Sequence, residues 1–238
     1  MKAAVIERKP KKAARSFGSR TLLSFALLAL ICAPLFSQQA GRQPNESRPS
    51  LQDVAAALAK NKVARGQFVL ERSAANGRVL KSSGAFTIAA DYGIIWKTEK
   101  PVKSVQAVAK DFIITESAAG KRAKLDGSQN KVYLQMALLT SALWTGDLAA
   151  VQAAAAANFR SDENSWTLEL LPKDAAVQMA LEKIVVAGTW SPSAAQSLPK
   201  AAATLMEMRL KGGNSARYLM SGHEYDSALT SAELSYFN

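Results

Sequence analysis

The sequence predicts an α+β fold in which an antiparallel sheet carries about three helices on one face. Short segments that alternate apolar and polar residues recur between turn signals about every ten residues. Two other regions, residues 50–60 and 131–159, carry apolar residues at helical spacing. Because a sheet of this many strands tends to curl or close, we expect it to be curved.

Residues 1–40 are organised like a secretory signal, with basic, apolar and small polar regions in that order. The apolar run 21–36 has 16 residues, fewer than the roughly 20 of a membrane-spanning helix. A cleaved signal ending near Ala40 is therefore the favoured prediction, and it places the remaining chain outside the cytoplasm. The long basic region keeps an uncleaved anchor as the alternative. Lipidation of Cys32 is disfavoured because bulky Ile31 precedes it.

Much of the charge belongs to this segment. The chain carries +11, of which residues 1–20 contribute +6 and the chain after residue 40 only +5. The later basic residues are scattered and not interleaved with aromatic residues, which argues against nucleic-acid binding. Cys32 is the one cysteine, so a cleaved chain has no disulfide and no thiolate chemistry.

After the segment 1–40, residues 41–49 form a polar linker rich in turn residues, and a single domain over 50–238 is expected. Ser50 is placed to cap a short amphipathic helix, with Asp53 completing a capping box.

Strands follow up to about residue 115. Asn76-Gly77 indicates a hairpin, Pro101 ends a strand, and further pairing is expected around 112–115. The alternation places apolar side chains in pairs on one face of each strand: Phe68 with Leu70, Phe86 with Ile88, and Ile94 with Trp96.

Helical spacing returns at 131–144, which carries two apolar stripes and ends at Gly146. The alanine-rich residues 147–159 are predicted to continue as a helix. The remaining expectations are a strand at 165–172, a short helix at 174–184 capped by Asp174, a strand at 185–190, a loop at 191–200, and a hairpin that turns at 211–215.

Signals for catalysis are weak. His223 is the one histidine, and with Glu224 and Asp226 it is predicted to lie in an exposed turn. One histidine without cysteines is poor material for a zinc site, and no nucleophile-elbow motif is present. The acidic pair Asp162/Glu163 fits a solvated loop. No enzyme activity, metal or cofactor is therefore expected.

Large apolar side chains crowd residues 134–144, and they occupy more than one helical face. Tryptophans and methionines add adaptable apolar surface elsewhere. An ordinary core explains these residues, and so does a cavity lined for a flexible apolar guest. Composition is compatible with both.

The order of motifs resembles the periplasmic outer-membrane lipoprotein carrier (LolA-like) family. The resemblance covers about residues 50–238 and rests on GQFVLER, SSGAF, the WxxxxP element from Trp96 to Pro101, LLTSALW, and WTLELLPKD. It implies a strongly curved antiparallel sheet, an incomplete barrel, whose covering helices enclose an apolar cavity for acyl chains.

The resemblance also implies a function and partners. A non-enzymatic, monomeric periplasmic carrier would receive a lipoprotein or lipid from an inner-membrane exporter and pass it to an outer-membrane receptor. A membrane-tethered lipid sensor on the same fold is the alternative, and a hydrolase is disfavoured. The candidate cavity residues are Trp96, Ile95, Leu138, Leu139, Leu143 and Trp144.

One departure from the family concerns the lid. An Arg-Pro pair in the family helps to hold the empty carrier closed, and Ala90 and Asp91 stand at the aligned positions here. The chain is therefore expected to belong to a divergent branch, and the cargo to be a different lipid or lipid conjugate.

Overall fold

The structure is a computed structural model that describes residues 48–129, 131–191 and 200–238. The chain divides into two compact units, residues 1–41 and 42–238, and the described residues belong to the second. The predicted signal 1–40 with Cys32, most of the linker 41–49 and most of the loop 191–200 lie outside the described residues. Within them, no helix is long and apolar enough to cross a membrane.

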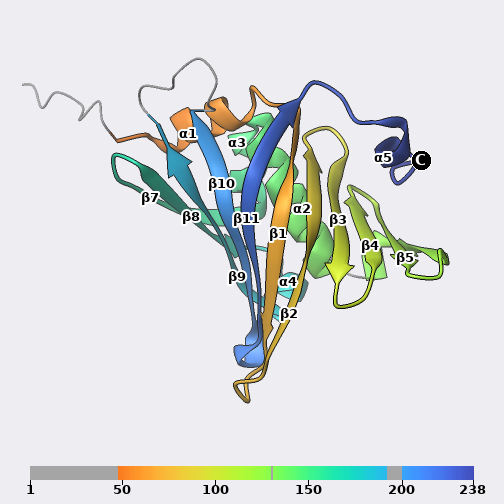
Figure 1. The fold of residues 1–238 in the computed structure, drawn as a ribbon. Coiled ribbons are helices and arrows are strands. Elements are labelled where there is room, and N and C mark those ends of the chain that lie inside the picture. The colour runs from red at the N-terminus through yellow and green to blue at the C-terminus, as the bar shows by residue number, and fades with distance from the viewer. Residues whose placement is uncertain (1–47, 130, 192–199) are drawn as a thin grey trace, which may run out of the picture. The chain divides into compact units, whose positions relative to one another are not determined.

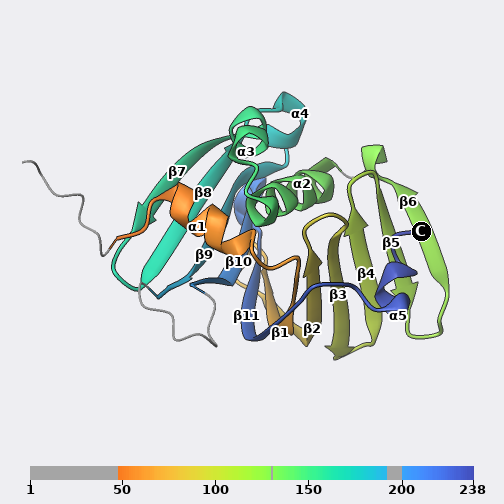
Figure 2. The same ribbon diagram turned by 90° about the horizontal axis from the view of Figure 1, so that it is seen from above.

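An 11-stranded antiparallel sheet dominates the second unit. Figures 1 and 2 show it curving around the helices α1, α2 and α3. The sheet is not closed, because β6 and β7 form its two edges. Its strands are β1 (Val63–Ser73), β2 (Val79–Ala89), β3 (Gly93–Lys100), β4 (Ser104–Ala109), β5 (Phe112–Ser117), β6 (Arg122–Asp126), β7 (Ala155–Ser161), β8 (Ser165–Pro172), β9 (Leu181–Trp190), β10 (Ala201–Leu210) and β11 (Ser215–Asp226).

Two meanders make up this sheet. The strands β1 to β6 pair in chain order, and so do β7 to β11. The pairing of β1 with β11 joins the two halves, with Phe68 opposite Met220 and a bulge between Arg65 and Gln67. The hairpins predicted at Asn76-Gly77 and at 211–215 are both confirmed.

Five α-helices occur in the described residues, rather than about three: α1 (Leu51–Leu58), α2 (Lys131–Thr145), α3 (Leu148–Ala154), α4 (Ala175–Gln178) and α5 (Ser231–Leu234). The capping box of α1 is present as predicted, with the Asp53 amide donating to Ser50 Oγ at 3.2 Å. Gly146 ends α2 in the left-handed region at φ +74, where glycine has no steric penalty.

The prediction of helix for 147–159 is wrong in its second half. The helix ends at Ala154, and Ala155–Ser161 forms β7 along β8. Alanine has a high helix propensity, but β8 needs a partner for its backbone, and this pairing also packs Phe159 against the core. The helix predicted at 174–184 likewise stops early, at Gln178, because Leu181, Ile184 and Val186 are buried on the sheet face as part of β9.

The main hydrophobic core fills the concave face of the sheet. Alternate residues of the central strands point into it, as the sequence pattern predicts for Phe68, Leu70, Phe86 and Ile88. Helices α1, α2 and α3 cover this face with Leu58, Leu139, Leu143, Trp144 and Val151. Burial of alternate residues sets the register of strand pairing, since a slip by one residue would move the apolar side chains of a strand to the opposite face of the sheet.

The C-terminal segment packs on the opposite, convex face. Figure 2 shows α5 on the other side of β3 to β5 from α2. Tyr236 and Phe237 pack against a second buried cluster of Ile95, Val105, Ala107 and Ile114. Arg65 of β1 donates to Glu233 of α5 from Nε at 2.8 Å and from Nη2 at 2.6 Å, and Thr87 donates to the same carboxylate at 2.8 Å.

Candidate functional site

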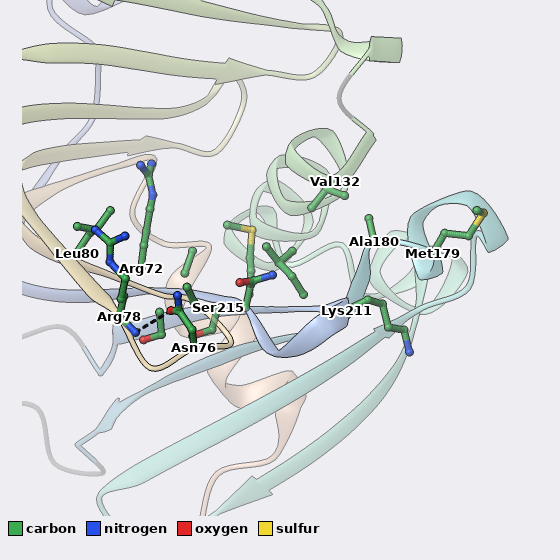
Figure 3. Close-up of a pocket in the computed structure, with 15 residues that line it drawn as sticks. Arg72, Asn76, Arg78, Leu80, Val132, Met179, Ala180, Lys211 and Ser215 are labelled. Atoms are coloured by element: carbon green, nitrogen blue, oxygen red, sulfur yellow. Dashed lines mark hydrogen bonds between the residues drawn. The ribbon is translucent and has the colours of Figure 1, made fainter.

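A cavity of about 740 Å³ lies on the concave face at the end of the sheet where two hairpins turn (Figure 3). We call it the tip cavity. It is enclosed by the tip of the β1–β2 hairpin, the tip of the β10–β11 hairpin, the start of α2 and the end of α4. Its lining consists of Arg72, Ser73, Ala74, Asn76, Arg78, Leu80, Val132, Met179, Ala180, Met208, Leu210, Lys211, Asn214, Ser215 and Ala216.

Hydrogen bonds donated by backbone amides hold the walls of the tip cavity together. The turn of the first hairpin is closed by a bond from Ala74 N–H to the Arg78 carbonyl at 2.9 Å. The Ala75 amide donates to Asn214 Oδ1 at 3.2 Å, which ties the first hairpin tip to the second. The Lys211 amide donates to the Ala180 carbonyl at 2.9 Å and so links the second hairpin to the end of α4.

The floor of the tip cavity is apolar. Met208 and Ala216 are buried and continue the strand face that carries the main core, and Val132 and Leu210 pack beside them. Towards solvent the lining stays apolar in places, because Leu80 is 63% exposed and Met179 is 82% exposed. Large apolar side chains at the rim of an apolar cavity are typical of a binding site.

The charged residues that line the tip cavity are all basic. Arg72 and Arg78 lie together on one side of it and Lys211 lies on the other (Figure 3). No aspartate or glutamate is among the lining residues. The cavity therefore combines an apolar floor with a positively charged rim.

None of the six residues predicted to line a cavity contacts the tip cavity. Trp96, Leu139, Leu143 and Trp144 are buried together in the main core. Ile95 points to the opposite face of the sheet, into the cluster under the C-terminal segment, because neighbouring strand residues alternate in direction. Their role in binding stays a prediction, and for Ile95 it cannot be in the same cavity as Trp96.

Leu138 lies elsewhere. It is 40% exposed and lines a second hollow of about 390 Å³ beside Ala90 and Asp91. There the Ser141 hydroxyl donates to the Ala90 carbonyl at 2.6 Å, which fixes α2 to the end of β2. Ala90, which aligns with the arginine of the LolA-like family, thus holds α2 through its backbone carbonyl.

An aromatic cluster occupies the centre of the concave face. Trp96 stacks on Tyr218 with ring centroids 4.1 Å apart and meets Phe68 edge-on at 5.2 Å. The indole Nε1 of Trp96 is buried without a hydrogen-bond partner. The sequence pattern places Phe68 on the core face, but the approach of Tyr218 depends on the pairing of β1 with β11, which no local pattern reveals.

The prediction that His223 lies in an exposed turn is wrong. His223 is half-buried in β11, with its ring centroid 5.5 Å from Phe86 and 6.2 Å from Tyr225. Burial lowers the pKa of His223 below the ordinary value for histidine and so favours the neutral imidazole. In the part of the chain that the structure describes, no three histidine, cysteine, aspartate or glutamate residues are grouped to hold a metal ion.

The acidic residues have structural partners. Asp162 accepts bonds from the Ser165 hydroxyl at 2.7 Å and from the Asn164 amide at 2.9 Å, and its pKa is lowered chiefly by that hydroxyl. Asp226 pairs with Arg65 at 3.3 Å. These carboxylates therefore stabilise a turn and an ion pair rather than facing a cavity together.

Tyr225 provides a test of burial at the concave face. Its hydroxyl is buried without a hydrogen-bond partner, and burial raises the pKa of Tyr225 to about 12. We expect Tyr225→Phe to raise the free energy of unfolding by about 1 kcal/mol, because it removes a desolvated polar group and leaves the ring in place. Urea unfolding at pH 7 measures this change. A loss of stability would instead mean that the hydroxyl is bonded, to water or to a ligand.

Comparisons with known proteins find similarities among solved structures. No protein-family model matches the sequence, and neither does any curated protein sequence. A LolA superfamily protein from Nitrosomonas europaea is 13% identical, with a TM-score of 0.42 over 76% of this chain and 96% of that one. A putative outer membrane lipoprotein-sorting protein domain from Vibrio parahaemolyticus is 12% identical, with a TM-score of 0.40 over 77% of this chain and 97% of that one.

A DUF1329 family protein from Desulfovibrio piger is 13% identical, with a TM-score of 0.44 over 79% of this chain and 95% of that one. At these identities and TM-scores, the similarities do not decide fold or function, and the function is inferred below from this chain's own residues.

Proposed function

We propose that residues 50–238 form an exported, non-enzymatic carrier that shelters the acyl chains of a lipid or lipoprotein. The tip cavity carries this proposal, because it joins an apolar floor to an open, basic rim. Its volume of about 740 Å³ falls within the roughly 300–1,000 Å³ typical of small-molecule sites. The carrier would work in the periplasm as a monomer, between an inner-membrane donor and an outer-membrane acceptor.

Energetics make such carriage feasible. Each buried methylene contributes about 0.8 kcal/mol, so an acyl chain of about 16 carbons gains roughly 12 kcal/mol on full burial. The tip cavity is partly open, so the gain there is smaller. Transfer into a membrane returns a similar gain, which allows cargo to leave. A modest difference in affinity between donor, carrier and acceptor then sets the direction of transfer.

Native mass spectrometry of the protein purified from the periplasm tests the proposal. A reproducible lipid or acylated-peptide adduct supports a carrier. A mass without adduct, together with failure of every lipid to displace a bound hydrophobic dye, would refute it. Tight lipid binding without transfer of lipid between vesicles would favour a sensor on the same fold.

A substitution that narrows the cavity provides a further prediction. Ala180 is exposed and lines the tip cavity, so Ala180→Trp places a bulky ring at the opening without disturbing the core. We expect the affinity for a fluorescent fatty acid to fall at least about tenfold, which corresponds to about 1.4 kcal/mol. Dye titration measures it.

Ala176→Trp is the matched control. Ala176 is also exposed, and it lies on α4 outside the lining of the cavity. This variant should bind the probe as the unmodified protein does. Equal affinities for all three proteins would place the binding site away from the tip cavity.

A further inference from the structure

The rim of the tip cavity supplies hydrogen-bond donors without matching acceptors. Arg72 and Arg78 come from the first hairpin and Lys211 from the second (Figure 3). Among the described residues, no ion pair involves any of these three side chains. Other cations of the same sheet do have carboxylate partners, as Lys81 has in Glu71 at 2.8 Å.

The uncharged polar residues of the rim also offer hydrogen-bond donors to the tip cavity. Asn76 Oδ1 accepts from the Arg78 amide at 3.1 Å, and Asn214 Oδ1 accepts from the Ala75 amide at 3.2 Å. Each of these carbonyl oxygens thus already accepts one hydrogen bond, and the NH₂ groups remain as donors. Ser73 and Ser215 lie opposite each other in the β1–β11 pair and add two hydroxyls to the lining.

A rim with these properties fits an anion. Guanidinium groups bind phosphate oxygens with charge-assisted, often paired hydrogen bonds, and Lys acts beside them as a point charge. The apolar floor at Met208, Leu210 and Val132 lies next to this rim, so one molecule can occupy both parts only if it is an amphiphile. Its polar end must be anionic and its other end must be hydrocarbon.

We infer that the tip cavity recognises a lipid with a phosphate-bearing, net-negative headgroup. Arg72, Arg78 and Lys211 bind the headgroup, and the acyl chains lie on the apolar floor. This inference rests on the proposed function and narrows it, because an acyl-modified protein without a phosphate near its acyl chains would leave the basic rim unmatched.

Binding of short-chain, monomeric lipids to the full-length protein tests the inference. The probes are dioctanoyl-phosphatidylglycerol, uncharged dioctanoylglycerol and inorganic phosphate, titrated by calorimetry at low salt and at about 0.3 M salt. We expect the anionic lipid to bind at least about tenfold more tightly than the uncharged one at low salt, with the difference shrinking at high salt. Inorganic phosphate should bind much more weakly than the anionic lipid, since it gains nothing from the floor.

The double variant Arg72→Gln/Arg78→Gln should lose at least about tenfold in affinity for the anionic lipid and keep its affinity for dioctanoylglycerol. The matched control is Lys81→Gln/Arg217→Gln. It removes the same charge from neighbouring strand positions, where Arg217 is exposed on the convex face and Lys81 pairs with Glu71. This control should bind both lipids as the unmodified protein does.

The failures are distinguishable. Equal binding of charged and uncharged lipid, or equal losses in the two double variants, would overturn the headgroup assignment and leave lipid carriage standing. Phosphate alone binding as tightly as the anionic lipid would replace the lipid with a free anion. Failure of every lipid to bind would overturn the proposed function itself.

Discussion

Trp96→Ala is expected to lower the free energy of unfolding by about 3–5 kcal/mol, as truncations of large buried aromatic residues do. Trp96 is only 2% exposed, stacks on Tyr218 at 4.1 Å and meets Phe68 at 5.2 Å, at the point where β1 and β11 join the two halves of the sheet. The loss of these ring contacts leaves a void in the centre of the core. Equilibrium unfolding in urea measures the change through the shift in midpoint.

Trp96→Phe is the control for this prediction. It keeps a ring in the cluster and removes the indole N–H that has no partner. The smaller ring costs packing, but the loss of a desolvated donor offsets part of that, so the net change should stay below about 1.5 kcal/mol. The contrary result is a change of less than about 1 kcal/mol in the free energy of unfolding of Trp96→Ala together with loss of lipid binding. That result would mean that Trp96 lines an occupied cavity, as predicted from the sequence.

Glu233→Gln is expected to destabilise the protein at pH 7 by an amount on the order of 2 kcal/mol. The carboxylate is 17% exposed and accepts bonds from Arg65, Thr87 and Thr230. The Arg65 hydrogen bond is the main reason that the pKa of Glu233 falls from 4.5 to about 2. The amide keeps the shape of the side chain but loses the charge that attracts the guanidinium.

This ion pair also makes stability depend on pH. Because the folded-state pKa of Glu233 is depressed, its contribution is complete above about pH 4.5 and is lost as the pH falls towards 2. Urea midpoints measured from pH 7 down to pH 2 should therefore converge for Glu233→Gln and the unmodified protein. Glu163→Gln, at an exposed position of the β7–β8 turn, should stay within about 0.5 kcal/mol of the unmodified protein throughout. Curves that run parallel down to pH 2 would contradict the assignment.

Local patterns were sufficient to predict β1, β2 and β3 and the side chains of these strands that face the core. The alternation at Phe68/Leu70 and Phe86/Ile88 identifies the side chains that face the core, because successive residues of a strand point to opposite faces of the sheet. The sequence also predicts the capping roles of Ser50 and Asp174, since an N-cap side chain accepts a hydrogen bond from a backbone amide only three residues further along the chain.

The features that the sequence did not predict depend on pairing between segments far apart in the chain. Residues 155–161 have helical composition but become a strand because β8 lies beside them. The local sequence around His223 predicts a turn. The pairing of β11 with β1, which includes a bulge, instead places His223 against Phe86. The tip cavity was missed for the same reason. Its basic side chains lie on two hairpins whose tips are more than 130 residues apart in the chain.

The central pairing of β1 with β11 also has a consequence for how the chain acquires its structure. Every other strand pair joins neighbours in chain order, whereas this one closes across more than 140 residues. Loop closure over such a span slows folding, since its entropy is lost before the contact is made. We expect the two meanders to form first, with the edge of β1 that faces β11 left unpaired until β11 has been synthesised. A holding chaperone that shields extended apolar strands would therefore act most usefully on residues 63–73 during synthesis.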